Sequence, residues 1–178
     1  MDYFTSLYEA PFGILALDFV NGKLQGVTIS EHERDHFSGF DLRRTPRRIA
    51  RLFDDFFDGK DVDFGFEYCI ASTPLQNKIY RIITQIPRGK AATYGHVARL
   101  AGTHPRIVGN ACRRNMMPFV VPCHRVVRGD GAVGLYIGKP YASALKFWLL
   151  QMEGSAPEGV DPWPEPWNAK LPASSLLR

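Results

Sequence analysis

A cysteine followed by a histidine and an arginine is the grouping in this chain best suited to covalent chemistry. Cys123 stands directly after Pro122, and the apolar residues 119–121 before it predict a short buried strand that the proline ends. An isolated cysteine is more often a small buried hydrophobe. Here the neighbouring His124 and Arg125 favour the thiolate, which is the nucleophilic form. The sequence therefore predicts a nucleophile at a strand end.

A glutamate further along the chain is a candidate partner for the histidine. A helix is predicted over 143–152, and Glu153 follows it directly. A carboxylate at a helix C-terminus opposes the helix dipole at a cost of a few tenths of a kcal/mol. We therefore expect Glu153 to have a partner, and His124 is the natural one. The core face of this helix is predicted to consist of Leu145, Trp148, Leu149 and Met152.

The charge of the chain is unevenly distributed. The net charge is only +4, but no Asp or Glu occurs from residue 68 to residue 129. Such asymmetry is typical of a surface that meets a polyanion, and nucleic acid is the expected partner. The basic residues of this span are Lys78, Arg81, Arg88, Lys90, Arg99, Arg106, Arg113, Arg114, Arg125 and Arg128.

Three scattered cysteines do not make a disulfide framework, so a reducing, cytoplasmic setting is expected. There is no apolar run long enough for a membrane helix, and the N-terminus lacks the layout of a secretory signal. His32, His36 and Cys69 have no metal-ligand spacing, and we predict neither a metal nor a cofactor.

The N-terminal part predicts a small α+β module. Strands are expected at 3–8, 13–20 and 23–29, and Asn21-Gly22 between the last two is typical of a type I′ hairpin. Apolar residues at helical spacing predict a helix over 47–57. No candidate for chemistry lies in this part.

A new helix is predicted to begin at Ser72-Thr73-Pro74, where a hydroxyl cap precedes a proline. Its stripe of apolar residues is expected to be core: Leu75, Ile79, Ile82, Ile83 and Ile86. We place a domain boundary before it, between residues 71 and 72.

Two short helices then form a helix-turn-helix pattern. Thr93 caps the first, over 94–100, and Thr103 or His104 caps the second, over 105–114. The inward side of the second helix is predicted to hold Ile107, Val108, Ala111 and Cys112, which makes Cys112 structural. The outer side is predicted to present Arg106, Gly109, Asn110, Arg113 and Arg114, and it suits DNA.

The ordered motifs closely resemble the O6-alkylguanine-DNA alkyltransferase (methylated-DNA–protein-cysteine methyltransferase) family. The likeness covers about residues 72–154, and only in outline the N-terminal part. It rests on Ile86-Pro87-Arg88-Gly89-Lys90, Thr93-Tyr94-Gly95, Pro105-Arg106-Ile107-Val108-Gly109, Arg114-Asn115, Pro122-Cys123-His124-Arg125-Val126-Val127, the Tyr136 loop and Glu153-Gly154.

This resemblance implies an α+β fold with an RNase H-like N-terminal domain (1–71) and a helical DNA-binding and alkyl-transfer domain (72–154). The residues after these, 155–178, are rich in proline and have no periodicity, so we expect them to form a tail. The catalytic set it implies is Cys123, His124, Glu153, Asn115 and Tyr94. The DNA-binding set is Arg106, Gly109, Asn110, Arg113 and Tyr94. The substrate pocket it implies is formed by Tyr136, Ile137, Pro118 and Val126.

The resemblance also implies the reaction. A monomer would bind the minor groove of double-stranded DNA with little sequence preference, flip out an O6-alkylguanine and transfer the alkyl group irreversibly to its own cysteine. Arg106 would hold the flipped state, and Tyr94 would rotate the phosphate. Met116 and Ile137 depart from the family pattern, so the range of accepted alkyl groups stays open.

Three other readings remain. A damage sensor of the alkyltransferase-like type would keep the fold without the transfer, although its members replace the cysteine that is present here. A cysteine hydrolase could use the same residues, but adjacent Cys and His on a strand end would point apart. A helix-turn-helix regulator would bind tightly to a specific sequence, whereas we expect weak, salt-sensitive binding.

Overall fold

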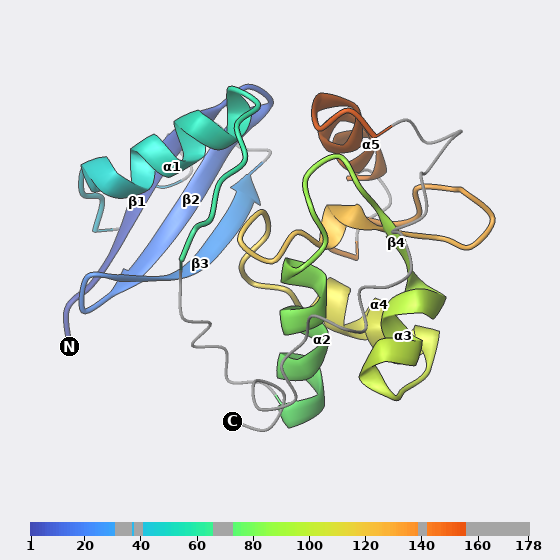
Figure 1. Ribbon diagram of the computed structural model, residues 1–178. Helices are drawn as coiled ribbons and strands as arrows, with labels where there is room; N and C mark the ends of the chain where they lie inside the picture. Colours follow the sequence, from blue (N-terminus) through green and yellow to red (C-terminus); the bar gives the residue numbers. More distant parts are fainter. Residues whose placement is uncertain (31–36, 38–40, 66–72, 139–141, 156–178) are drawn as a thin grey trace. The chain divides into compact units, whose positions relative to one another are not determined.

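The structure, a computed structural model, describes residues 1–30, 37, 41–65, 73–138 and 142–155. The chain is α+β and divides into two compact units (Figure 1). The N-terminal unit consists of Met1–Ile70 and, from later in the chain, Met116–Val120. The C-terminal unit consists of Ala71–Asn115 and Val121–Arg178.

The N-terminal unit contains a three-stranded antiparallel sheet. Its strands are β1 (Tyr3–Ala10), β2 (Gly13–Val20) and β3 (Lys23–Ser30), in the spatial order β1-β2-β3. Asn21 has φ 50° and Gly22 has φ 74°, the left-handed pair that a type I′ hairpin needs. The three predicted strands and their hairpin are confirmed.

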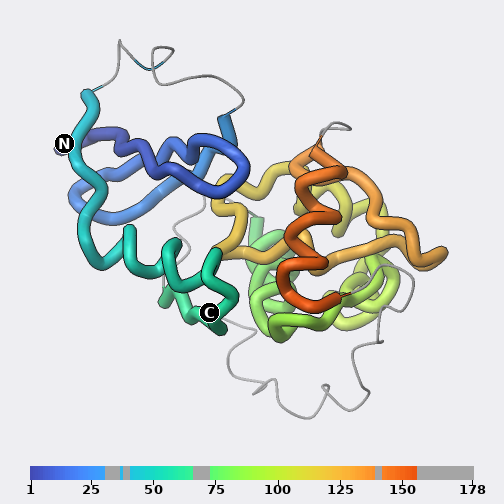
Figure 2. Tube along the Cα trace, turned by 90° about the horizontal axis from the view of Figure 1, so that it is seen from above, coloured from blue at the N-terminus to red at the C-terminus, as the bar shows by residue number. Residues whose placement is uncertain are grey.

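Helix α1 (Arg47–Phe57) covers one face of this sheet, as predicted (Figures 1 and 2). The ring of Tyr8 on β1 contacts Phe53 at 5.3 Å between ring centroids, and its hydroxyl donates to Asp54 Oδ1 at 2.8 Å. The buried residues of the helix are Ile49, Phe53 and Phe56, so its inward face is largely aromatic.

The C-terminal unit is built mainly of helices. They are α2 (Pro74–Thr84), α3 (Tyr94–Ala101), α4 (Pro105–Arg113) and α5 (Ser143–Met152). Strands β4 (Ala92–Thr93) and β5 (Val126–Val127) pair in parallel. The predicted helices are thus all present.

Side chains cap three of these helices. Thr73 Oγ1 accepts from Gln76 N at 3.2 Å, and Thr93 Oγ1 accepts from His96 N at 3.1 Å. The cap of α4 is His104, whose Nδ1 accepts from Arg106 N at 3.2 Å. This decides between the two caps that the sequence allows for α4.

Two side chains predicted to be core are partly exposed. Leu75 is 37% and Ile107 41% exposed, because they line a small surface cavity between α2 and α4 together with Gln76 and Asn110. The predicted core face of α5 is also wrong in part. Trp148 is exposed, whereas the side chain of Lys146 is fully buried.

The predicted strand at 119–121 is wrong. The chain makes a tight turn there, with Phe119 at φ 74°. Pro122, at φ −77° and ψ 62°, then forms an inverse γ-turn in which Cys123 N donates to Val121 O at 2.7 Å. Cys123 begins the 3₁₀ helix η2 (Cys123–Arg125), so it precedes strand β5 and does not end a strand.

No helix within the described ranges is long and apolar enough to cross a membrane. The sequence-based inferences on His32, His36 and Cys69, and on the tail beyond residue 155, concern residues outside the described ranges.

Replacement of the α3 cap tests how strongly the local sequence fixes the start of this helix. We expect Thr93→Ala to lower the free energy of unfolding by about 1 kcal/mol, because the amide of His96 loses its acceptor. Thr103→Ala is the matched control, since His104 and not Thr103 caps α4. Denaturant unfolding of both variants measures the difference. Equal losses would contradict the assigned caps.

Candidate active site around Cys123

The thiol of Cys123 is buried at the start of η2, with the residue only 2% exposed. The inverse γ-turn at Pro122 holds its backbone, since the proline ring already fixes φ near the value that this turn requires. Two consecutive turns, one at 119–120 and one at 122, therefore present the sulfur atom on a backbone with little freedom.

The side-chain amide of Asn115 makes the only hydrogen bond to this sulfur that we find among the described residues. Asn115 Nδ2 lies 3.2 Å from Cys123 Sγ, and the same nitrogen donates to Val121 O at 2.9 Å. Asn115 is itself buried. A hydrogen bond to sulfur favours the charged form of a thiol, so this amide is placed to stabilise a thiolate.

Glu153, at the end of α5, lies at the centre of a buried charge network. Its carboxylate accepts two hydrogen bonds from Arg125, Nε to Oε2 and Nη2 to Oε1, both at 2.8 Å. His124 Nε2 lies 3.0 Å from Oε1. Arg125 Nη1 also donates to Ile86 O at 2.6 Å. The predicted contact between His124 and Glu153 is present, and Arg125 shares the carboxylate with the imidazole.

The electrostatics of this network are set by burial and by the arginine. Burial alone would raise the pKa of the Glu153 carboxyl, but His124 and Arg125 outweigh it and hold that pKa well below its usual range. Burial also lowers the pKa of His124, although Glu153 opposes this. A neutral imidazole beside an ionised carboxylate can accept a proton, which is the protonation state that a general base needs.

A second loop packs against the end of α5, where Arg88 Nη1 lies 3.9 Å from Glu153 Oε1. Arg88 Nη2 donates to Met152 O at 3.0 Å. Gly89 has φ 74°, and a Cβ atom there would lie 2.9 Å from the carbonyl oxygen of Glu153. Glycine is thus required at this position both for its backbone conformation and for the close approach.

Lys146 is a candidate site residue that the sequence reasoning missed. Its ammonium group is buried, donates to Val126 O at 2.6 Å and lies 3.5 Å from the Tyr94 hydroxyl. Burial lowers the pKa of Lys146 to about 8, although the thiols of Cys112 and Cys123 oppose this. The available signal was its spacing, because it lies three and four residues before Leu149 and Leu150, which are buried.

Opposing influences act on the pKa of the Cys123 thiol. Burial is the largest and raises it, whereas the hydrogen bond from Asn115 and the charge of Lys146 lower it. Burial likewise raises the pKa of the Tyr94 hydroxyl, which keeps Tyr94 protonated and able to donate.

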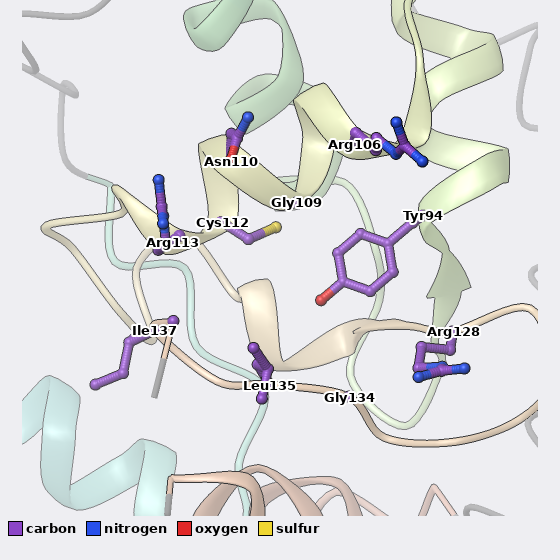
Figure 3. A pocket seen from close by; sticks show the side chains of 11 residues that line it. Tyr94, Arg106, Gly109, Asn110, Cys112, Arg113, Arg128, Gly134, Leu135 and Ile137 are labelled. Atoms are coloured by element: carbon purple, nitrogen blue, oxygen red, sulfur yellow. The ribbon is translucent and has the colours of Figure 1, made fainter. Parts of the chain in front are cut away.

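A cavity of about 550 Å³ is lined by Tyr94 and by the predicted DNA-binding residues of α4 (Figure 3). The thiol of Cys112 points from α4 toward the Tyr94 ring. A Cβ atom at Gly109 would meet nothing within 4 Å, so this wall is open to an approaching group. The lining consists of Tyr94, Arg106, Gly109, Asn110, Cys112, Arg113, Arg128, Gly134, Leu135, Ile137 and Gly138.

The loop that bears Tyr136 forms the other wall of the cavity. Ile137 lines it and has φ 45°, a conformation that a β-branched residue rarely adopts. Tyr136 is buried and is not among the lining residues, and its hydroxyl has no hydrogen-bond partner within the described ranges. Val126 is buried, and Pro118 belongs to the N-terminal unit; neither is among the lining residues. Their predicted pocket role stays a prediction.

The described residues contain no group of three His, Cys, Asp or Glu side chains that could hold a metal ion. The side chains gathered around Cys123 supply a thiol, an imidazole that can take a proton, and hydroxyl and ammonium groups that can give one. Such a set can perform a nucleophilic displacement and protonate the group that leaves.

Known proteins resemble this chain over the same region. Residues 74–155 match the family model described as "6-O-methylguanine DNA methyltransferase, DNA binding domain". A methylated-DNA–protein-cysteine methyltransferase of Methanothermobacter thermautotrophicus is 41% identical over 119 residues, which cover 64% of this chain and 66% of that protein.

Two further comparisons extend this likeness. A protein of the same name from Methanopyrus kandleri is 36% identical over 64% of this chain and 85% of its own length. The crystal structure of Mycobacterium tuberculosis OGT in complex with DNA superposes with a TM-score of 0.69 at 25% identity, covering 88% of this chain and 98% of that one. The chain belongs to the methylated-DNA–protein-cysteine methyltransferase family.

Proposed function

We propose that this protein repairs O6-alkylguanine in double-stranded DNA by transferring the alkyl group irreversibly to Cys123. The observation that carries the proposal is the environment of the thiol, which accepts a hydrogen bond from Asn115 and lies in the field of the buried Lys146. Family membership and the relatives named for this activity support it.

The transfer is a single displacement. The thiol proton passes to the neutral imidazole of His124, through a water molecule, and Glu153 stabilises the imidazolium that results. The thiolate attacks the alkyl carbon, so a sulfur–carbon bond forms as the carbon–O6 bond breaks. The electron pair of that bond stays on guanine, which takes up one proton. We infer that this proton comes from the Tyr94 hydroxyl, which lies 3.5 Å from Lys146 Nζ.

The product cysteine is a thioether, so one molecule reacts once. Cys112, the other described cysteine, gives no route back to a free Cys123, because burial raises the pKa of its thiol well above the ordinary value and keeps it protonated. We infer that the protein is consumed in proportion to the damage that it repairs.

DNA binding is proposed to use α3 and α4 as a helix-turn-helix in the minor groove. In the minor groove the base pairs present few distinguishing hydrogen-bonding groups. Binding there suits a repair protein, which must tolerate any flanking sequence. Arg106 would fill the space of the flipped nucleotide, and the backbone at Gly109 leaves room for the DNA strand. The DNA complex of the M. tuberculosis protein supports this partner.

The remaining features follow from the same proposal. The protein would act as a monomer in the cytoplasm, where a reactive thiol stays reduced. The sheet and helix of the N-terminal unit would form an RNase H-like arrangement.

Intact mass after incubation with duplex DNA that contains O6-methylguanine tests the reaction. We expect the wild type to gain one methyl group and no more, and Cys123→Ser to gain none. Cys112→Ser is the matched control, since it removes a thiol that lines the cavity, and it should still be methylated. Methylation of Cys123→Ser would show that Cys123 is not the nucleophile, and a loss of methylation in Cys112→Ser would move the nucleophile to Cys112. Binding without any mass gain would indicate a sensor.

Removal of the buried ammonium group tests its effect on the thiol. We expect Lys146→Met to slow the reaction with free O6-benzylguanine about tenfold at pH 7, because the pKa of Cys123 rises when the nearby positive charge is lost. The difference in rate between the variant and the wild type should shrink as the pH rises through about 8, because wild-type Lys146 then loses its charge. Lys23→Met, at an exposed lysine of the N-terminal unit, is the control. If Lys146→Met left the pH dependence of the reaction rate unchanged, Lys146 would have no effect on the Cys123 thiol.

Arg106→Ala tests the step in which the nucleotide leaves the duplex. Flipping costs a few kcal/mol, so we expect repair of duplex DNA to slow by about tenfold to a hundredfold. The reaction with free O6-benzylguanine, which needs no flipping, should be unaffected. Arg99→Ala removes an exposed positive charge from α3 that does not line the cavity, and it controls for general electrostatics. Equal slowing of both substrates by Arg106→Ala would refute the proposed role.

A further inference from the structure

A five-residue segment of the N-terminal unit is flanked in the chain by site residues of the C-terminal unit. Met116–Val120 belongs to the N-terminal unit, whereas Asn115 and Val121, on either side of it, belong to the other. Val27 N on β3 donates to Met116 O at 2.8 Å, which fixes the beginning of the segment to the sheet.

The middle of the segment is anchored by an aromatic side chain. Phe119 is 2% exposed, and its ring lies 5.7 Å from the rings of Phe56 and Phe57 and 6.2 Å from those of Phe12 and Phe53, measured between centroids. We call these five residues the aromatic cluster. Most of the ring pairs meet edge to face, an arrangement that favours one fixed geometry.

The backbone at Phe119 is held in an unfavourable conformation. Its φ of 74° lies in the left-handed region, which a residue other than glycine seldom occupies. Such a conformation persists only where the surrounding contacts impose it, and strained residues of this kind concentrate near functional sites. The aromatic cluster supplies those contacts, so burial of the ring determines the turn.

The two ends of this turn meet at one side-chain amide. Asn115, which precedes the segment, donates from Nδ2 both to Val121 O at 2.9 Å and to Cys123 Sγ at 3.2 Å. The position of Val121 depends on how the chain returns from the turn. The hydrogen bond to the sulfur atom therefore depends on a loop whose geometry is set at Phe119.

We propose that Phe119 is a positioning residue for the reaction at Cys123. Its ring, fixed in the aromatic cluster, holds the turn that brings Asn115, Val121 and Cys123 into hydrogen-bonding register. Phe119 touches no reacting atom and acts only through Asn115. The inference rests on the proposed role of Cys123 as the nucleophile.

The test compares two phenylalanines of the same core. Phe119→Leu removes the anchor. Phe64→Leu makes the same change at a buried ring that lies 5.3 Å from Phe53 and 5.9 Å from Phe56 but is not on the segment. Both should lower the melting temperature. Only Phe119→Leu should raise the pKa of the Cys123 thiol and slow the reaction with free O6-benzylguanine, by about tenfold at pH 7.

The ionisation of the Cys123 thiol is measured directly as well as through the reaction rate. The ultraviolet absorbance of the thiolate is followed against pH in each full-length variant, with the same variant carrying Cys123→Ser as the blank. This titration remains measurable if the protein fails to react with alkylguanine, so a failure of the proposed function is distinguishable from a failure of this inference. Identical titrations for Phe119→Leu and Phe64→Leu would overturn the positioning role.

Two further variants identify the route of the effect. Phe119→Gly suits the left-handed backbone but lacks the ring. It should therefore shift the titration of the Cys123 thiol as Phe119→Leu does. A titration like that of the wild type would show that the ring is not the anchor. In a protein that already carries Asn115→Ala, Phe119→Leu should cause no additional shift. An additive shift would show that Phe119 does not act through Asn115.

Discussion

The ion pair of Glu153 with Arg125 is the interaction on which the C-terminal unit most depends. A carboxylate without access to water is costly unless its charge and its lone pairs are satisfied. Here Arg125 satisfies both oxygen atoms, and His124 shares one of them. The same guanidinium reaches Ile86 O, so one group joins the end of α5, helix η2 and the chain after α2. Loss of Arg125 would leave the buried carboxylate with only the weaker contacts of His124 at 3.0 Å and Arg88 at 3.9 Å among the described residues.

The proposed nucleophile, Cys123, is subject to opposing electrostatic effects. Burial raises the pKa of the Cys123 thiol, whereas the hydrogen bond from Asn115, the charge of Lys146 and a backbone hydrogen bond at Cys123 lower it. A thiol that is fully exposed and ionised would react with any electrophile in the cell. For a protein that reacts once, such side reactions would be irreversible losses. Burial of the sulfur limits them, because a substrate must first reach it in the correct orientation.

Local patterns predicted most of the fold. The three strands, the Asn21-Gly22 hairpin and the capped start of α3 follow from propensities that act over a few residues, and all are present. The errors concern tertiary context. The β-propensity of residues 119–121 was overridden, because the aromatic cluster fixes Phe119 in a turn. Periodicity placed Trp148 in the core, but the buried face of α5 is rotated toward Lys146, whose charge argued against burial.

The candidate site was predictable to a similar extent. The pairing of His124 with Glu153 was expected from one unfavourable carboxylate at a helix end, and it is present. The bidentate contact of Arg125 and the burial of Lys146 were not, since both depend on side chains that are distant in the sequence. A hydropathy pattern assigns a lysine to the surface, so it points away from burial of the ammonium group. Burial of Lys146 is expected only when its neighbours on the helix are known to be buried.

The interleaving of the two units limits how this architecture could be divided. Every residue of the candidate site lies after residue 71, and the matched family region, 74–155, looks like a self-contained module. A fragment made of that region alone would nevertheless carry Phe119 without the partners of its ring, and Met116 without the strand that binds its carbonyl. An apolar ring would then be exposed on a loop with no reason to keep its shape. The N-terminal unit, which contributes no reactive group, is in this sense part of the working module, and recombination or truncation at residue 71 would separate the chemistry from its support.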